Sequence, residues 1–247
     1  MPLAELILST GLRREPIALS CLGCETPLVP DQGLAWCEEC GIGRSVRAFD
    51  AAFYDEMYAQ RYESYAGTVI GDELNLARWA LLHLHCQPIQ RLLDYGCGVG
   101  TFLAYCEKAV PSLTGIDVNP VALRFARSRC HRSTLIQTSV DGLMDWARTW
   151  DWTVVTYWDT FEHLADPLTE AVWSAQWIAL SLPIYRDQAH CRASKHCKPT
   201  EHLGHYTARG LTQVVDRQGF DLVVHDAREQ VQGREDIETF LFRRREA

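Results

Sequence analysis

Three alternating glycines, Gly96, Gly98 and Gly100, follow a short apolar run that ends near Asp94. A second acid, Asp117, lies where the next apolar run ends. Glycine allows both a sharp turn and a close approach of the backbone to a ligand, because it has no Cβ. A carboxylate about 20 residues after such a loop is the group that binds the two hydroxyls of a ribose. The spacing therefore predicts a site for a cofactor that contains adenosine.

The details of this loop favour one cofactor over another. A nicotinamide or flavin dinucleotide is bound by Gly-x-Gly-x-x-Gly, whereas this loop reads Gly-x-Gly-x-Gly and continues into Thr101. Asp94 lies directly beneath the loop, where its carboxylate would repel a pyrophosphate. S-adenosylmethionine has a sulfonium and an ammonium group and no phosphate. It therefore fits both the altered glycine spacing and the acid beneath the loop. A turn that only packs against the protein is the remaining alternative.

The composition limits the class of protein. The chain has 247 residues, 47% of them hydrophobic, which is enough for one sizeable domain and a small appendage. Its formal net charge of −8 argues against a broad surface for nucleic acid. No apolar run reaches the length of a membrane span, and the first residues lack a secretory pattern. We therefore expect a soluble, cytoplasmic protein with no membrane partner.

Four of the ten cysteines form a compact N-terminal group. They are arranged as two Cys-x-x-Cys pairs, Cys21 with Cys24 and Cys37 with Cys40, separated by twelve residues. Two such pairs bind zinc tetrahedrally, and four protein ligands leave no open position, so we expect a structural zinc ribbon over 1–48. Iron or disulfide bonds are the alternatives. A unit this small cannot build its own core, so metal binding would supply its folding free energy.

From residue 91 onward, strand and helix patterns alternate. Helices are expected over 99–109, 120–129 and 207–217, and strands over 91–95, 112–117, 134–137, 152–159, 177–183, 220–226 and 237–243. This alternation predicts an α/β domain over 89–247, with a doubly wound, mostly parallel, Rossmann-like sheet of seven strands and ligands at the carboxyl ends of the strands. The last two strands have no helix between them and should form an antiparallel hairpin.

The segment 49–88 is expected to form a helical lid or linker between the ribbon and this domain. Aromatic residues recur at helical spacing around Tyr58 and Arg61, and 74–84 has the pattern of an amphipathic helix. The aromatic stripe has two interpretations. It either packs in the core, or it covers the cofactor, with Arg61 or a tyrosine hydroxyl binding the methionine carboxylate.

Several of these segments resemble the class I S-adenosylmethionine-dependent methyltransferases. Residues 92–100 are similar to their glycine motif, 114–120 to their ribose-binding motif, and 151–164 to their fourth-strand motif. Residues 201–207 resemble a late segment of the branch that is similar to the ubiquinone-biosynthesis O-methyltransferase. The N-terminal cysteine group is not part of the usual pattern of that branch.

The resemblance implies roles for individual residues. The three glycines would line the methionine part of the cofactor and Val118 would pack on the adenine. The family usually has an acid for the adenine amino group where this chain has Ser139, so either Ser139 or Asp141 would make that contact. The full set of expected cofactor-binding residues is Asp94, Gly96, Gly98, Gly100, Asp117, Val118, Ser139, Val140, Trp158, Tyr58 and Arg61.

Three residues are candidates for catalysis. Methyl transfer is an in-line displacement, so alignment is the main task of the enzyme, and a base is needed only when the acceptor must lose a proton. Asp159 and His163 follow the expected fourth strand, and histidine titrates in the useful range. His202, further along the chain, is the third candidate. The alternative is that Glu162 and His163 only cap and pack the start of a helix.

The segment 186–206 is expected to be a long loop on the rim of the site. Loops of this length inside a compact domain are usually functional. Its basic residues Arg192, Lys195 and Lys198 would face an anionic group of the substrate. Its histidines and cysteines raise the alternative of a second metal site. Residues 233–236, at the tip of the last hairpin, should project toward the same rim.

Three functions are consistent with the sequence. The leading interpretation is transfer of a methyl group from S-adenosylmethionine to a small-molecule, carrier-bound or glycosyl acceptor. The second is a methyltransferase for RNA or DNA whose zinc ribbon docks the polymer. The third is a cofactor-binding module without turnover. A steep loss of polymer binding with added salt would favour the second interpretation.

Overall fold

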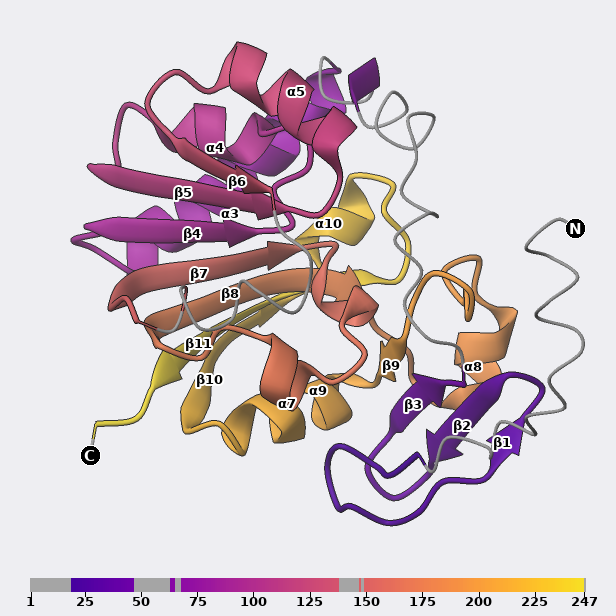
Figure 1. The fold of residues 1–247 in the computed structure, drawn as a ribbon. Helices are drawn as coiled ribbons and strands as arrows, with labels where there is room; N and C mark the ends of the chain where they lie inside the picture. Colours follow the sequence, from indigo (N-terminus) through magenta and orange to yellow (C-terminus); the bar gives the residue numbers. More distant parts are fainter. Residues whose placement is uncertain (1–18, 47–62, 65–67, 138–146, 148, 247) are drawn as a thin grey trace, which may run out of the picture.

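The computed structural model describes residues 19–46, 63–64, 68–137, 147 and 149–246, which form one large sheet and one small sheet (Figure 1). The large sheet has seven strands in the order β10-β11-β8-β7-β4-β5-β6. These strands are β4 (Arg91–Tyr95), β5 (Ser112–Asp117), β6 (Thr134–Gln137), β7 (Trp152–Trp158), β8 (Ala175–Pro183), β10 (Phe220–Asp226) and β11 (Ile237–Arg244).

The directions of these strands confirm the predicted topology. The five strands from β4 to β8 are parallel to one another, and β11 is antiparallel to both β8 and β10. The chain runs outward from β4 through β5 to β6 and then returns to β7 on the other side of β4. Ligands of such sheets bind at the carboxyl ends of the strands where the order reverses. The ends of β4 and β7 are therefore the place for a site.

Helices connect most of these strands (Figure 1). The longer ones are α3 (Val69–His85), α5 (Pro120–Arg129) and α9 (Ala208–Asp216), and the shorter ones are α4 (Thr101–Cys106), α7 (Pro167–Glu170), α8 (Gln188–Ala193) and α10 (Arg228–Val231), with a 3-10 turn η2 (Phe161–His163). Side chains cap the first turns of the three longer helices: Thr68 accepts from Gly71 N, Asn119 from Val121 N and Thr207 from Gly210 N.

The core lies on both faces of the central strands. All seven residues of β7 are buried, as expected for a parallel strand that is covered on both sides. In β4, Leu92 and Leu93 point to opposite faces of the sheet and are both fully buried. This burial fixes the ends of β4 and β7 rigidly against each other, so the segments that follow them start from defined positions.

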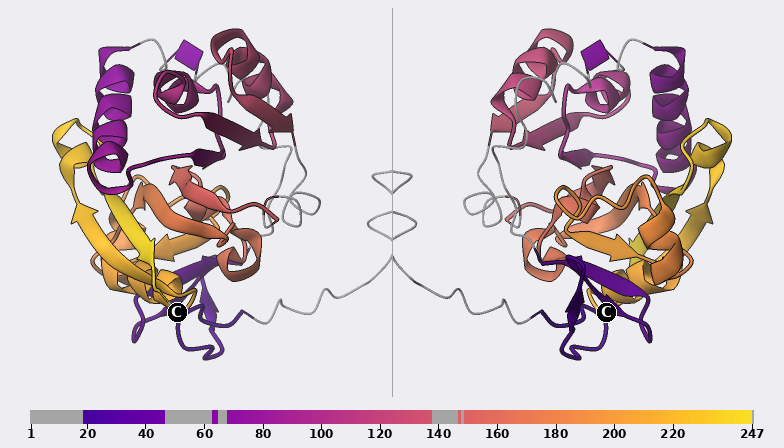
Figure 2. Two further views of the ribbon diagram at one scale, coloured as in Figure 1. Left: turned by 90° about the vertical axis from the view of Figure 1, so that its left-hand side faces the viewer. Right: turned by 90° about the vertical axis from the view of Figure 1, so that its right-hand side faces the viewer.

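The N-terminal residues form the small sheet together with a strand from much later in the chain. Its order is β1 (Pro30–Asp31), β2 (Leu34–Cys37), β3 (Ile42–Ser45) and β9 (Gly204–Tyr206), all antiparallel. Figure 1 shows β3 beside β9, and the two views of Figure 2 show the N-terminal strands at this same end of the molecule. The ribbon sheet is thus completed by the main part of the chain.

Side-chain hydrogen bonds hold the ribbon to the large domain. Arg44 donates to the carbonyl oxygen of Ala165 at 2.6 Å, and Arg217 of the large domain donates to the carbonyl oxygen of Gly23 at 2.6 Å. Ile42 and three of the ribbon cysteines also belong to the same buried cluster as Tyr157 of β7. These contacts give the ribbon a fixed place on the domain. Within the described residues, no helix is long and apolar enough to cross a membrane.

Candidate active site

The glycine loop follows β4 directly, as predicted. Gly96, Gly98 and Gly100 have φ values of 75°, 52° and 77°, a conformation that side chains with a Cβ rarely adopt. At Gly96 the loop is tight, because an added Cβ would lie 2.3 Å from Thr160 Oγ1. At Gly98 an added Cβ would meet no atom within 4 Å. The open side of the loop is therefore at Gly98, where a ligand can approach the backbone.

Asp117 stands at the end of β5 beside this open position. Its carboxylate accepts the N–H of Gly98 at 2.8 Å and the N–H of Asn119 at 2.8 Å, and it is partly exposed. Burial raises the pKa of Asp117, against the opposing effect of these backbone donors. Because a carboxylate can accept further hydrogen bonds, Asp117 has capacity left for ligand hydroxyls. Val118 follows it and is also partly buried.

Asp94 lies beneath the loop and is only 2% exposed. Thr156 of the neighbouring strand β7 donates its hydroxyl to Asp94 Oδ1 at 2.7 Å. Burial raises the pKa of Asp94 to about 7, although the Thr156 hydrogen bond and the charge of Arg78 act in the opposite direction. Asp94 is thus a carboxyl group that ionises near neutral pH. A cationic ligand above it would favour the ionised form.

Trp158 ends β7 and contacts a buried arginine. The Arg78 guanidinium carbon lies 4.8 Å from the centroid of the Trp158 ring, a cation–π contact. The rings of Trp158 and Phe102 pack in a T-shaped arrangement at a centroid distance of 5.3 Å. The buried indole Nε1 has no hydrogen-bond partner within the described part of the chain. A buried donor without an acceptor is costly, which makes a bound group a candidate acceptor.

Asp159 belongs to a network of buried charges. It accepts hydrogen bonds from Arg78 at 3.2 Å and from Arg234 at 2.6 Å, and both arginines also bind Glu229. Burial would raise the pKa of Asp159, but Arg234 and Arg78 outweigh it and hold the value at about 2. Asp159 is therefore ionised at neutral pH and is a weak base. Arg78 also donates to Ser181 Oγ at 2.9 Å.

Two members of this network, Arg78 and Glu229, are not among the site residues expected from the sequence, whereas Arg234 belongs to 233–236, the hairpin tip expected at the rim. Arg78 comes from α3, Glu229 from α10 and Arg234 from the connection before β11. Glu229 is 3% exposed and Arg78 is 9% exposed. Residues of this type are rarely so buried without a partner. The isolated Arg in the apolar pattern of 74–84 was the one signal in the sequence that could have pointed to such a pair.

A second polar cluster lies just beyond Asp159. The imidazoles of His163 and His202 meet edge to face with a centroid distance of 4.9 Å, so the structure brings these two candidates together. His163 Nδ1 lies 2.9 Å from the carbonyl oxygen of Glu201. Because a carbonyl only accepts, Nδ1 holds the proton and the lone pair of neutral His163 is on Nε2. Burial lowers the pKa of His163, so this ring is neutral at neutral pH.

Glu162 completes this cluster. One ligand atom each of Glu162, His163 and His202 lies within 4.8 Å of the others, so the three could also hold a metal ion. Glu162 Oε2 and His202 Nδ1 are buried and have no hydrogen-bond partner among the described residues. Burial raises the pKa of Glu162 well above its usual value and lowers that of His202 well below its own. Burial thus favours the neutral form of both groups.

The segment 186–206 is not the continuous loop that we expected, because it contains α8 and β9. The three basic residues that we expected to face the substrate are each paired with a carboxylate of the protein: Arg192 with Asp31, Lys195 with Glu235 and Lys198 with Glu201. The exposed Arg186 has no ion pair among the described residues. These pairs neutralise the cations that we expected to face an anionic group. The tip of the last hairpin does reach this segment, since Ser194 donates to Asp236 at 2.5 Å.

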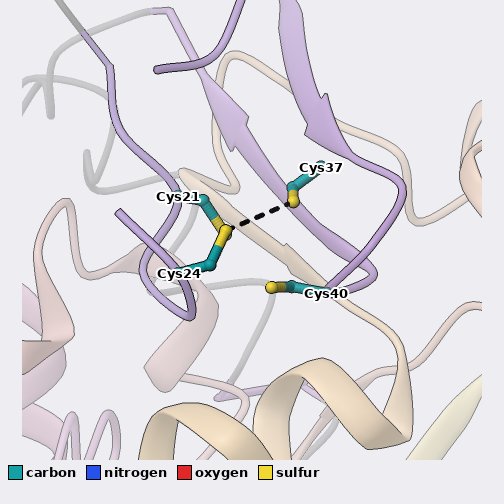
Figure 3. A group of neighbouring side chains, drawn as sticks. All are labelled: Cys21, Cys24, Cys37 and Cys40. Carbon is teal, nitrogen blue, oxygen red and sulfur yellow. Dashed lines mark hydrogen bonds between the residues drawn. The ribbon is translucent and has the colours of Figure 1, made fainter. Parts of the chain in front are cut away.

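The four N-terminal cysteines converge (Figure 3). Their sulfur atoms all lie within 4.8 Å of one another, and Cys24 Sγ and Cys37 Sγ are 3.8 Å apart. Four thiolates around a tetrahedral zinc, each with Zn–S of about 2.3 Å, have S···S distances of about 3.8 Å. Gly23 N also donates to Cys21 Sγ at 3.4 Å. The donor set and its spacing fit a zinc ion.

Four of the expected cofactor-binding residues lie outside the described part of the chain. They are Tyr58, Arg61, Ser139 and Val140. Their roles stay predictions. The remaining expected residues all lie where β4, β5 and β7 end, at the point where the strand order reverses.

Comparison with known families agrees with this geometry. A family model described as a methyltransferase domain matches residues 62–225, about two thirds of the chain. The match begins after the N-terminal cysteine ribbon and includes the glycine loop, Asp117 and the β7 segment. No curated protein matches the sequence.

Solved structures show the same fold. The chain is similar to the magnesium protoporphyrin IX methyltransferase of Synechocystis with bound SAH, at 12% identity and a TM-score of 0.56, over 79% of this chain and 98% of that one. It is similar to a SAM-dependent methyltransferase of Archaeoglobus fulgidus, at 16% identity and a TM-score of 0.54, over 77% of this chain and 100% of that one. It is also similar to the plantazolicin methyltransferase BpumL, at 16% identity and a TM-score of 0.53, over 78% of this chain and 93% of that one. Identities this low show the fold and leave the acceptor open.

Proposed function

Because this chain belongs to the family of methyltransferase domains and is an S-adenosylmethionine-dependent methyltransferase, we propose that its acceptor is a small-molecule, carrier-bound or glycosyl metabolite. The observation that carries this proposal is the charge state of the rim. Arg78 and Arg234 of the site are paired with carboxylates of the protein, and so are three of the four lysine and arginine side chains of 186–206; the fourth, Arg186, is exposed and has no ion pair among the described residues. A polymer of phosphates would have to displace these pairs, whereas a compact acceptor would not.

The residues around the glycine loop fit the cofactor. S-adenosylmethionine supplies a methyl group on a sulfonium that is already activated for displacement. Asp117 would accept the hydrogens of the ribose hydroxyls, because it already stands beside the open backbone of Gly98. Asp94 would provide a negative charge under the cationic methionine part. Loss of either carboxylate should weaken binding without unfolding the sheet.

His163 is the best-placed base. Its neutral imidazole has a lone pair on Nε2, because Nδ1 is directed to the Glu201 carbonyl. When the acceptor is a hydroxyl or amine, its lone pair forms the new bond to the methyl carbon, the carbon–sulfur bond breaks toward sulfur, and the acceptor proton passes to Nε2. Loss of such a base typically costs 10²–10⁴-fold in rate. His202 would hold the ring of His163 in place through their edge-to-face contact.

Asp159 would act differently from His163. With a pKa of about 2 and two arginine partners, it cannot take up a proton near neutral pH. Its fixed charge would instead hold Arg78 against Trp158 and so shape the wall of the cofactor site. We also propose that the ribbon cysteines hold one structural zinc, since their four sulfur atoms match the spacing of a closed tetrahedral site.

Two measurements test the proposal. Isothermal titration of the full chain with S-adenosylmethionine should show binding, and a turnover screen with methyl-labelled cofactor against phenols, amines, glycosides and carrier-bound acceptors should identify the acceptor class. His163→Asn should lower the turnover rate at least 100-fold while the cofactor dissociation constant stays within twofold. Glu201→Gln is the matched control, because the contact to His163 is made by the backbone carbonyl of residue 201, which this change retains.

Three results would contradict the proposal. Turnover on RNA or DNA with steep salt dependence, and none on small acceptors, would favour the polymer alternative. Cofactor binding without turnover on any acceptor would favour the binding module. An unchanged rate for His163→Asn would remove this residue as the base and leave alignment alone as the source of catalysis.

A further inference from the structure

Two cysteines and a histidine outside the ribbon lie together beneath α8. Cys191 belongs to α8, Cys197 follows this helix, and His205 is the middle residue of β9. Cys191 is fully buried and His205 is 1% exposed, while Cys197 is partly exposed. The cluster packs against Leu34 of the ribbon strand β2. The cluster therefore belongs to 186–206 and lies where this segment packs against the ribbon.

The distances within this group match those between ligands of one metal ion. Cys191 Sγ lies 3.8 Å from Cys197 Sγ and 3.6 Å from His205 Nδ1. With Zn–S of about 2.3 Å and Zn–N of about 2.05 Å, a tetrahedral angle gives S···S of about 3.8 Å and S···N of about 3.6 Å. A disulfide bond needs sulfur atoms about 2.05 Å apart, far closer than these two are. The Sγ···Sγ distance equals that between Cys24 and Cys37 in the ribbon.

Ordinary packing does not account for the group. The buried thiols of Cys86 and Cys106 offer a comparison within the same protein. Neither belongs to a group of three possible ligands among the described residues. Among the described residues outside the ribbon, convergence of two thiols and an imidazole on one point is therefore specific to this place.

We propose that Cys191, Cys197 and His205 form a second zinc site, with a fourth coordination position for water or an external donor. The ion would join α8, the turn after it and β9. Because β9 pairs with β3, with His205 opposite Gly43, the ion would also fix 186–206 to the ribbon sheet. The proposal does not depend on the methyl acceptor, since it concerns the metal content of the protein alone.

The metal content of the purified full chain tests this proposal. Inductively coupled plasma mass spectrometry should find two zinc ions per chain in the wild type. Cys197→Ser should reduce this number to one, and it is the mildest variant because its side chain is partly exposed. Cys37→Ser, in the ribbon, should also leave one ion. Cys86→Ser is the matched control, a buried thiol outside both groups, and should retain two.

Cobalt substitution gives a second readout that needs no variant. In the wild type, thiolate-to-cobalt absorption should saturate only after two equivalents, because six thiolates are distributed over two sites. Saturation at one equivalent, one zinc ion per wild-type chain, or two ions retained by Cys197→Ser would each overturn the proposal. So would a Cys191–Cys197 disulfide found by mass spectrometry in freshly purified protein.

Discussion

Asp94 should make the affinity for S-adenosylmethionine depend on pH. Its carboxyl group is 2% exposed, and burial raises its pKa to about 7. Only the ionised form attracts the cationic methionine part of the cofactor, so binding should strengthen as the pH rises through this value. Asp94→Asn removes the charge and keeps an oxygen that can accept the Thr156 hydroxyl at the same place.

The size of this change in affinity follows from the titration of the Asp94 carboxyl group alone. A carboxyl with a pKa of about 7 is ionised in about 9% of molecules at about pH 6 and in about 76% at about pH 7.5. If only the ionised form binds, affinity rises about eightfold, or about 1.2 kcal/mol. The amino group of the cofactor keeps its proton over most of this range, because the usual pKa of an α-amino group is about 7.7–8.0. The rise should therefore reverse only above about pH 8.

Isothermal titration of wild type and Asp94→Asn at these two pH values, at constant ionic strength, measures the effect. His163 and His202 are present in both proteins, so the difference between the two slopes isolates Asp94. The variant should bind S-adenosylmethionine more weakly than wild type at the higher pH, and its affinity should not fall toward the lower pH. A wild-type affinity that changes less than twofold, or an equal rise in the variant, would refute a charged Asp94 beneath the cofactor.

Glu229→Gln should lower the free energy of unfolding by about 3 kcal/mol, because it leaves the buried Arg78 and the partly buried Arg234 undercompensated. Chemical denaturation should show a loss of less than about 0.5 kcal/mol for the exposed control Glu235→Gln, and equal losses would contradict the network. Gly98→Ala should stay folded, since its Cβ meets no atom within 4 Å, at a conformational cost of about 1–2 kcal/mol. Calorimetry should nevertheless show at least tenfold weaker cofactor binding, and unchanged binding would place the cofactor elsewhere. Asp117→Asn should weaken cofactor binding about tenfold, because charge-assisted hydrogen bonds contribute about 1.5–3 kcal/mol; wild-type affinity would remove the ribose assignment.

The sheet could be predicted because each of its strands is an apolar run of consecutive residues in the sequence. The apolar run 152–158 is buried at every position, and the run that ends at Asp94 forms β4 as expected. The helix predicted over 99–109 is shorter, Thr101–Cys106, because Gly100 adopts a left-handed conformation at the N-cap. Periodicity alone does not show where a helix starts when the loop before it must turn for a ligand.

The buried charges of the site could not be predicted in the same way. Arg78 lies 81 residues from Asp159 and 151 residues from Glu229 along the chain, and no spacing rule connects such distant residues. β9 has only three residues, so it is too short for any strand pattern to appear. The sequence pattern therefore does not show the meeting of His163 with His202 either, because the segment just before β9 places the second histidine.

β9 also sets an order of events during synthesis. The ribbon strands β1 to β3 leave the ribosome first, while the strand that pairs with β3 follows about 160 residues later, about 10–30 s at ordinary elongation rates. During this interval the four N-terminal cysteines are already present, but the free edge of β3 has no partner. An unpaired edge is a template for another chain. The nascent protein is therefore most vulnerable to mispairing between the emergence of Ser45 and that of Tyr206.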